Sequence, residues 1–297
     1  MKKETTALLG LISSMIIFGT IGIFRRYIPF PSSFLAMVRG FIGALFLFLI
    51  MLMLRKKPDM AEIKSNLVPL LISGGCIGFN WILLFEAYNY TSVATATLCY
   101  YFEPTFVILF TPIFLHSKLT PKKIFCVLLA FVGMVFVSGI LDTGIGKIQE
   151  MKGVLMGLGA AVIYAFVILI NKRMCKISAY GRTAIQLFFA SVVLIPYVLF
   201  TGAMEDLPLS PFNVAMTAIV CIVHTGVAYA LYFGSFENLP TETLALFSYI
   251  DPVVAVLLSA FILHEKMTVF TVIGAVLILG AAIWGELSEK NCKKEEN

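Results

Sequence analysis

Residues 92–120 read SVATATLCYYFEPTFVILFTPIFLHSKLT, and residues 240–268 read PTETLALFSYIDPVVAVLLSAFILHEKMT. The two stretches align at a shift of 148 residues. Each sets an acid before a proline, Glu103-Pro104 in the first and Asp251-Pro252 in the second, and each ends in a His-x-Lys-x-Thr motif. Apolar composition alone does not produce two polar motifs at one offset, so the sequence predicts an internal duplication.

Weaker matches extend this repeat toward the N-terminus. Trp81 pairs with Tyr229 at the same shift, and Arg39 pairs with Gln186 at a shift of 147 residues. One half therefore places a cation where the other places a neutral amide. Such asymmetry is expected if a single cavity between the halves binds an asymmetric solute.

The composition restricts the class of protein. Of 297 residues, 60% are hydrophobic and 13% are charged, whereas soluble proteins average about 25% charged residues. This excludes an ordinary soluble enzyme, a disordered chain and a nucleic-acid partner, and it predicts an integral membrane protein in the lipid bilayer. The six cysteines show no C-x-x-C spacing, so we expect no disulfide, metal site or cofactor.

Runs of roughly 20 apolar residues, the length of a transmembrane helix, occur ten times. They cover about 5–24, 34–54, 67–85, 92–115, 122–140, 152–171, 182–201, 212–233, 243–263 and 269–286. Five spans fall in each predicted repeat, residues 1–146 and 147–297. Because five is odd, the second repeat would enter the membrane from the opposite side, as in the inverted repeats of secondary transporters. The predicted fold is all-α, with ten helices as two inverted fives.

The basic residues between the spans indicate orientation. If the N-terminus is cytoplasmic, 16 Lys and Arg lie inside and 5 lie outside. Cytoplasmic loops carry an excess of Lys and Arg, so we expect both termini to be cytoplasmic.

Further motifs occur at corresponding places in the two halves. They are Ser92-Val93-Ala94-Thr95-Ala96-Thr97 before Glu103-Pro104, Gly133, Leu239-Pro240-Thr241-Glu242-Thr243 before Asp251-Pro252, His264-Glu265-Lys266 and Gly274, with Pro31 and Arg39 around the second span. With these motifs the chain resembles EamA-type permeases of the drug/metabolite transporter superfamily over about residues 5–286. The pattern says little about substrate.

The resemblance implies a ten-helix fold of two inverted five-helix repeats. It implies a central cavity between helices 1–4 and 6–9, with helices 5 and 10 set aside for packing or for contacts in a homodimer. The chain departs from the family at Ser117, where members often have Glu; Glu265 keeps that residue in the second half.

Two acids are predicted near the middle of the membrane, where a charge is costly and usually functional. Glu103 and Asp251 are each followed by a proline, Pro104 and Pro252, which removes a backbone donor and loosens the helix. A backbone carbonyl that loses its helical donor, beside a carboxyl group, can coordinate a cation, an amine or a proton. The alternative is that each acid is protonated or hydrogen-bonded and the proline only kinks the helix.

Three further polar residues are candidates for substrate contact. Arg39 either binds a substrate carboxylate, pairs with an acid such as Glu86 or Glu103, or extends to the interface. His224 lies mid-span and either relays protons or bonds to a backbone carbonyl. Gln186, the repeat partner of Arg39, is the third candidate.

Asn80 and four aromatic residues complete the predicted site. Trp81, Tyr101, Tyr229 and Tyr249 lie too deep for the interfacial aromatic belt, and we expect them to form an amphipathic cavity wall for an amine or aromatic solute. Their alternative role is core packing with a satisfied hydroxyl.

The sequence predicts a secondary transporter of the plasma (inner) membrane and not an enzyme. The cargo would be a small organic metabolite, such as an amino acid or an amine, moved by alternating access. Export is the expected direction, and a proton is the expected coupling ion if transport is coupled. The alternatives are a non-transporting sensor or scaffold, or a channel.

Overall fold

The computed structural model describes residues 2–55, 60–115, 120–137, 148–174, 177–235, 238–239 and 241–295. The first half contains α1 (Lys2–Arg26), α2 (Ser32–Met53), α3 (Met60–Ser65), α4 (Leu67–Tyr90), α5 (Val93–Tyr100), α6 (Glu103–Leu115) and α7 (Pro121–Val137). The second contains α9 (Ile148–Arg173), α10 (Ala179–Phe200), α11 (Pro211–Cys221), η2 (Ile222–Val227), α12 (Ala228–Ser235), α13 (Thr241–Ser248), α14 (Ile250–Phe261) and α15 (Val269–Glu295).

The predicted spans coincide with these helices. Three of them are divided: 92–115 forms α5 and α6, 212–233 forms α11, η2 and α12, and 243–263 forms α13 and α14. Within the described residues, seven helices are long and apolar enough to cross a membrane, and Ile250–Phe261 and Val269–Gly285 are shorter apolar helices. The chain is an all-helical membrane protein. Two predicted features lie outside the described residues. They are Pro240 and the first His-x-Lys-x-Thr motif, including Ser117, of which only the final Thr120 is described.

Large apolar side chains also cover the outside of the bundle. Phe200 is 92% exposed, Met53 77% and Phe261 74%. A helix that is apolar on its outer face as well as its inner face suits a lipid environment, because acyl chains solvate the outer face.

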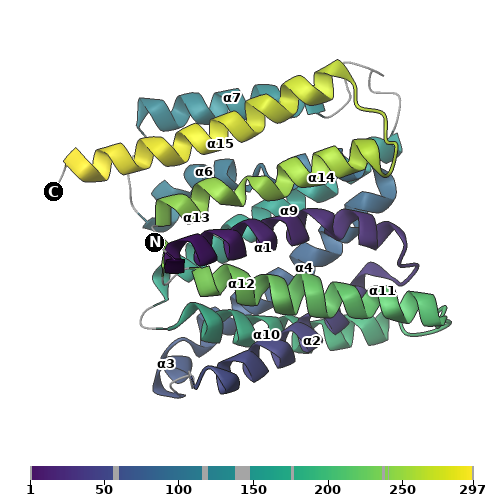
Figure 1. The fold of residues 1–297 in the computed structure, drawn as a ribbon. Helices are drawn as coiled ribbons and strands as arrows, with labels where there is room; N and C mark the ends of the chain where they lie inside the picture. Colours follow the sequence, from purple (N-terminus) through teal and green to yellow (C-terminus); the bar gives the residue numbers. More distant parts are fainter. Residues whose placement is uncertain are drawn as a thin grey trace.

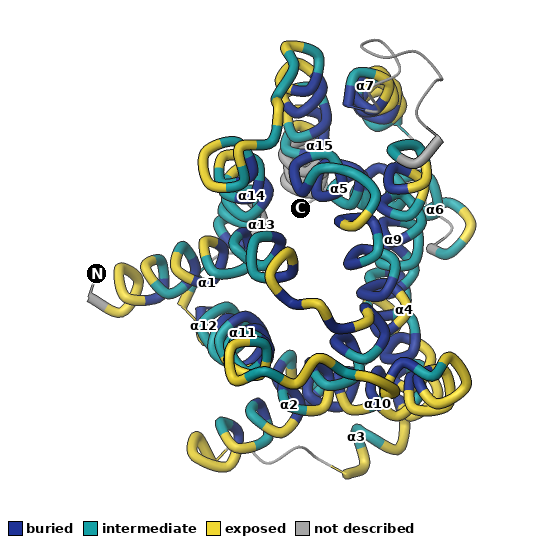
Figure 2. The backbone as a smooth tube through the Cα atoms, turned by 90° about the vertical axis from the view of Figure 1, so that its right-hand side faces the viewer, coloured by how far each residue is buried: buried dark blue, intermediate teal, exposed yellow. Residues whose placement is uncertain are grey.

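The packing joins the two halves helix by helix. α2 packs along α10, α4 along α9, and α7 along α15, and α1 contacts α12 and α14 (Figure 1). α1 begins and α15 ends at the same end of the bundle. Seen along the helix axes, α7 and α15 stand to one side of the other helices (Figure 2). Gly133 and Gly274 lie where these two cross, each against the other's carbonyl, so no side chain fits between them.

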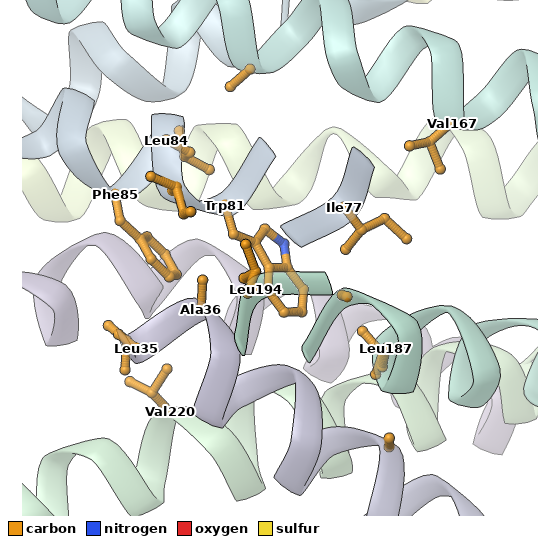
Figure 3. Packing of buried hydrophobic residues seen from close by; sticks show 14 of the residues in the cluster. Leu35, Ala36, Ile77, Trp81, Leu84, Phe85, Val167, Leu187, Leu194 and Val220 are labelled. Carbon is orange, nitrogen blue, oxygen red and sulfur yellow. The ribbon is translucent and has the colours of Figure 1, made fainter. Parts of the chain in front are cut away.

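The main core lies between α2, α4 and α10. Trp81 and Phe85 of α4 point toward Leu35 of α2 and Leu194 of α10 (Figure 3). Phe85, Leu35 and Leu194 are fully buried. This core forms one wall of the site described next.

Candidate functional site

A cavity of about 570 Å³ lies at the centre of the bundle. Both halves contribute to its lining, through residues of α1, α2, α4, α5, α6, α7, α9, α12, α13, α14 and α15. Eight of the twelve site residues predicted from the sequence line it. They are Arg39, Trp81, Tyr101, Glu103, Pro104, Tyr229, Tyr249 and Asp251.

Both acid-proline pairs lie just after a break in a span. α5 ends at Tyr100 and α6 begins at Glu103; α13 ends at Ser248 and α14 begins with Ile250 and Asp251. A proline cannot donate to the carbonyl four residues earlier, which ends the preceding helix. At the first break the carbonyl of Phe102 instead accepts from the amides of Thr105 and Phe106. The breaks therefore occur where the sequence predicted a loosened helix.

The two breaks are joined by a hydrogen bond across the cavity. The hydroxyl of Tyr101, between α5 and α6, donates to Oδ2 of Asp251 at 2.5 Å. The two residues are 150 positions apart, so only the packing of one half on the other brings them together. A phenol that donates to a carboxylate holds that carboxylate in place and leaves its other oxygen to face the cavity.

Arg39 supplies a cation to the cavity wall from α2. Its side chain is 4% exposed, its Nε donates to Oγ1 of Thr225 at 2.7 Å, and its guanidinium lies 4.0 Å from the centre of the Trp81 ring. The two terminal nitrogens of Arg39 have no hydrogen-bond partner among the described residues. Asp251 lines the same cavity as Arg39. Besides Glu103 and two lysines, the cavity therefore offers a buried guanidinium, that of Arg39, and the carboxyl group of Asp251 to a bound molecule.

Thr225 holds Arg39 from a π-helical turn. The segment η2 interrupts the span between α11 and α12, and turns of this type are frequent at functional sites. Thr225 is fully buried and its hydroxyl donates to the carbonyl of Val220 at 3.2 Å, which leaves a lone pair for Arg39. No residue pattern in the sequence predicts a π-helical turn, so the role of Thr225 as acceptor for Arg39 was not predicted.

Tyrosines form much of the remaining wall. Tyr88, Tyr100, Tyr164 and Tyr232 line the cavity beside the predicted Tyr101, Tyr229 and Tyr249. The rings of Tyr100 and Tyr164 lie 5.7 Å apart, and Tyr100 also contacts the ring of Tyr101. Depth in the predicted spans singled out Tyr101, Tyr229 and Tyr249, but it did not single out the other four, because apolar composition does not show which face of a helix a tyrosine occupies.

Four predicted site residues do not line the cavity. His224 contacts Thr20 through Nε2 at 2.8 Å and the Ile219 carbonyl through Nδ1 at 3.4 Å. Asn80 donates to the Ala160 carbonyl, and Gln186 donates to Ser73 and Asn171. Pro252 is buried. His224 thus has the contact of its alternative role, a bond to a backbone carbonyl, and Asn80 and Gln186 are buried side chains that donate to neighbouring helices.

The two ends of the cavity differ. At one end the lining includes Lys123 at the start of α7 and Lys172 near the end of α9. We call this the lysine end; Lys172 is exposed there, so the lining reaches the surface of the protein. At the other end the lining stops at Gly22, Tyr88 and Thr97.

Comparison with known proteins identifies the family. Residues 5–139 and 151–284 each match the model of the EamA-like transporter family. The two matches cover nearly the whole chain and correspond to its two halves.

The chain is 31% identical to a Bacillus subtilis (strain 168) protein described as uncharacterized transporter YxxF, over 93% of this chain and 88% of that one. Another protein of that bacterium, described as uncharacterized transporter YoaV, is 25% identical over 91% of this chain and 93% of its own length. A solved crystal structure superposes with a TM-score of 0.65 at 19% identity, covering 97% of this chain and 99% of that chain, which supports the fold alone.

Proposed function

The chain belongs to the EamA-like transporter family, and we propose that it carries a small organic solute with both an acidic and a basic group. It is a multi-pass transporter of the cell membrane and not an enzyme. Within that family, the proposal concerns the chemistry of the solute, the way it crosses, and the residues that bind it.

The observation that carries the proposal is the pairing of Arg39 with Asp251 in one central cavity. A buried guanidinium whose terminal nitrogens find no partner among the described residues favours an anionic group, because a desolvated cation without such a partner is costly. An acid in the lining of the same cavity favours a cationic group. An amino acid or a related amine-bearing acid satisfies both at once.

The size and lining of the cavity support a small solute. Ligand pockets commonly measure about 300–1,000 Å³, and this cavity measures about 570 Å³. Its tyrosines and Trp81 present aromatic faces that attract an ammonium group and pack against an apolar side chain.

We further propose alternating access by two inverted five-helix repeats, with both termini cytoplasmic. The paired helix packing between the halves and the two broken spans beside the cavity support this arrangement. Glu103 and Asp251 are the proposed carriers of a coupled proton, and export is the proposed direction.

A ligand screen followed by a transport assay tests the proposal. Purified protein is screened by thermal shift against amino acids, amines and simple carboxylates, since a ligand raises the melting temperature by mass action. Hits are then assayed for uptake into proteoliposomes, with and without a pH gradient. We expect a zwitterion to stabilise the protein more than the matching amine or acid alone.

The variant Asp251→Asn sharpens this test. It keeps the shape of the side chain and a hydrogen-bond acceptor for Tyr101 but removes the charge, so uptake should fall by roughly tenfold or more. Glu86→Gln, a conservative change at a glutamate outside the cavity lining, is the matched control and should leave uptake unchanged. Equal uptake by wild type, Asp251→Asn and Glu103→Gln, under both pH conditions, would contradict the assigned roles. Unitary currents in a planar bilayer would indicate a channel instead.

A further inference from the structure

Glu265 occupies a junction of three segments at the end of the bundle opposite the lysine end. It lies in the connection between α14 and α15. Its Oε1 pairs with Nη2 of Arg26, at the end of α1, at 2.7 Å. Its Oε2 accepts from the backbone amide of Val93, at the start of α5, at 2.8 Å, and from the hydroxyl of Ser259 on α14. We call Glu265, Arg26 and Ser259 the latch.

The latch caps a helix of the first half with side chains of the second half. The amide of Val93 donates to Glu265, and the amide of Ala94 lies 3.3 Å from Oγ of Ser259. The amides at a helix N-terminus have no partner within the helix and carry a partial positive charge, so a carboxylate there is stabilising. This cap exists only while α5 and α14 stay together at this end.

Close helix packing accompanies the latch. Gly22 of α1 lies against the side chain of Val93, and Gly19 lies against the carbonyl of Asp251 and the side chain of Val254. α1 thus fits between α5 and α14 with almost no space left over. None of the three latch residues belongs to the lining of the cavity, which stops one turn deeper, at Gly22 and Thr97.

The opposite end differs in sequence as well as in lining. At the repeat shift of 148 residues, Glu265 corresponds to Ser117, which has no charge. At this position the second repeat therefore has an acid and the first repeat has none. Arg26 is partly accessible, with 36% of its side chain exposed, so water is available to solvate its charge when the pair separates.

We propose that the latch is the gate that closes this end of the cavity, and that its charge pair holds the protein open toward the lysine end. This inference rests on the proposed function in one respect, since a gate matters only if the cavity is used from both sides. In transport, α1 and the α14–α15 connection would separate from α5, breaking the Arg26–Glu265 pair and the bonds from the amides of Val93 and Ala94, while Ser92 would still cap the amide of Thr95.

Side-specific cysteine labelling tests the gate without any substrate. The reporter is Thr97→Cys, one helical turn below Val93 in the cavity lining, in a background whose six native cysteines are replaced by serine. A membrane-impermeant sulfonated maleimide is applied to intact cells and, separately, to inverted membrane vesicles. These two preparations expose opposite faces of the membrane.

We expect the reporter to react rapidly from one face, the lysine end, and at least tenfold more slowly from the other. Glu265→Gln keeps the shape of the side chain but removes the charge, and Arg26→Gln removes the partner. Either should raise labelling from the slow face by roughly tenfold, because charge-assisted hydrogen bonds to the closed state are lost. Glu86→Gln, at the same end of the bundle, should not change it.

The outcomes separate the gate from the function. Rapid labelling from both faces in the wild type, or unchanged labelling in both latch variants, overturns the gate. Retained labelling from the lysine face shows that each variant is folded. A protein that labels as expected but moves no solute contradicts the proposed function alone.

Discussion

Arg39 and Gln186 occupy equivalent positions in the two halves, on helices α2 and α10 that pack along each other. Both are almost fully buried, at 4% and 2% exposed. Arg39 lines the cavity and keeps two nitrogens unbonded among the described residues, whereas Gln186 donates to Ser73 at 2.6 Å and to Asn171 at 2.7 Å. The same position thus faces the cavity in one half, where we propose that it binds the solute, and packs between helices in the other.

The difference shows how a duplicated chain acquires an asymmetric cavity. Equivalent backbones place both side chains between the same kinds of helices, but only one of them retains unmet hydrogen-bonding capacity. A buried guanidinium without a bonded acid destabilises the empty protein and favours an anion, while a satisfied amide contributes to stability. Substitutions at the two positions should therefore have opposite signatures in transport and in stability.

Arg39→Gln, which copies the residue of the other half, should have the largest effect on transport. We expect uptake in proteoliposomes to fall by at least about tenfold, because the charged donor to the solute is lost. The melting temperature of the empty protein should stay the same or rise, since a desolvated cation is removed. Uptake and thermal unfolding of the same preparation measure both effects.

Arg39→Lys is the matched control for charge. Lysine keeps the cation but has no planar fork to bond a carboxylate through two nitrogens, and it cannot reproduce the Nε bond to Thr225. It should recover part of the uptake. If Arg39→Gln transports normally, the cation is not a solute contact and the contrast with Gln186 loses its functional meaning.

The sequence was sufficient for the parts of the fold and site that depend on local chemistry. Apolar runs located the helices, and prolines 104 and 252 located two of the three divided spans, because a missing backbone donor acts within one turn. Arg39 and Asp251 were recognisable as candidates because a charge within an apolar run is costly in the membrane and is usually functional.

The remaining features depend on contacts between distant segments. The bond from Tyr101 to Asp251 spans 150 positions, and the latch joins Arg26 to a residue 239 positions away. On sequence alone His224 was the candidate and its neighbour Thr225 was not. The π-helical turn decides between them, since it directs Thr225 to Arg39 and His224 to Thr20.

Thr225→Val should have a smaller effect than Arg39→Gln. Valine has the shape of threonine without the hydroxyl, so Arg39 keeps its charge but loses the bond that orients it. A hydrogen bond to a neutral acceptor of this kind contributes about 1 kcal/mol. We therefore expect the apparent affinity for the solute to fall by roughly fivefold. Concentration-dependent uptake measures it.

Thr217→Val provides the control for the loss of a threonine hydroxyl in the same span. Thr217 donates to the Asn213 carbonyl and does not line the cavity, so its substitution should leave apparent affinity unchanged. In the double variant Arg39→Gln/Thr225→Val the effects should not add, because Thr225 acts through Arg39. Additive losses would mean that Thr225 acts on transport by another route.

Gln186→Met should have the smallest effect on transport and a clear effect on stability. Methionine has a similar length but no amide, so Ser73 and Asn171 lose a buried partner, at a cost of roughly 1–3 kcal/mol. The melting temperature should fall by several degrees, while uptake per folded molecule stays at the wild-type level. Gln186→Glu keeps the shape of the side chain but replaces the donating Nε2 by an acceptor and adds a buried charge, so it should lower the melting temperature at least as much. If Gln186→Met instead lowers uptake as strongly as Arg39→Gln, both halves contact the solute at this position, and the cavity is more symmetric than its side chains indicate.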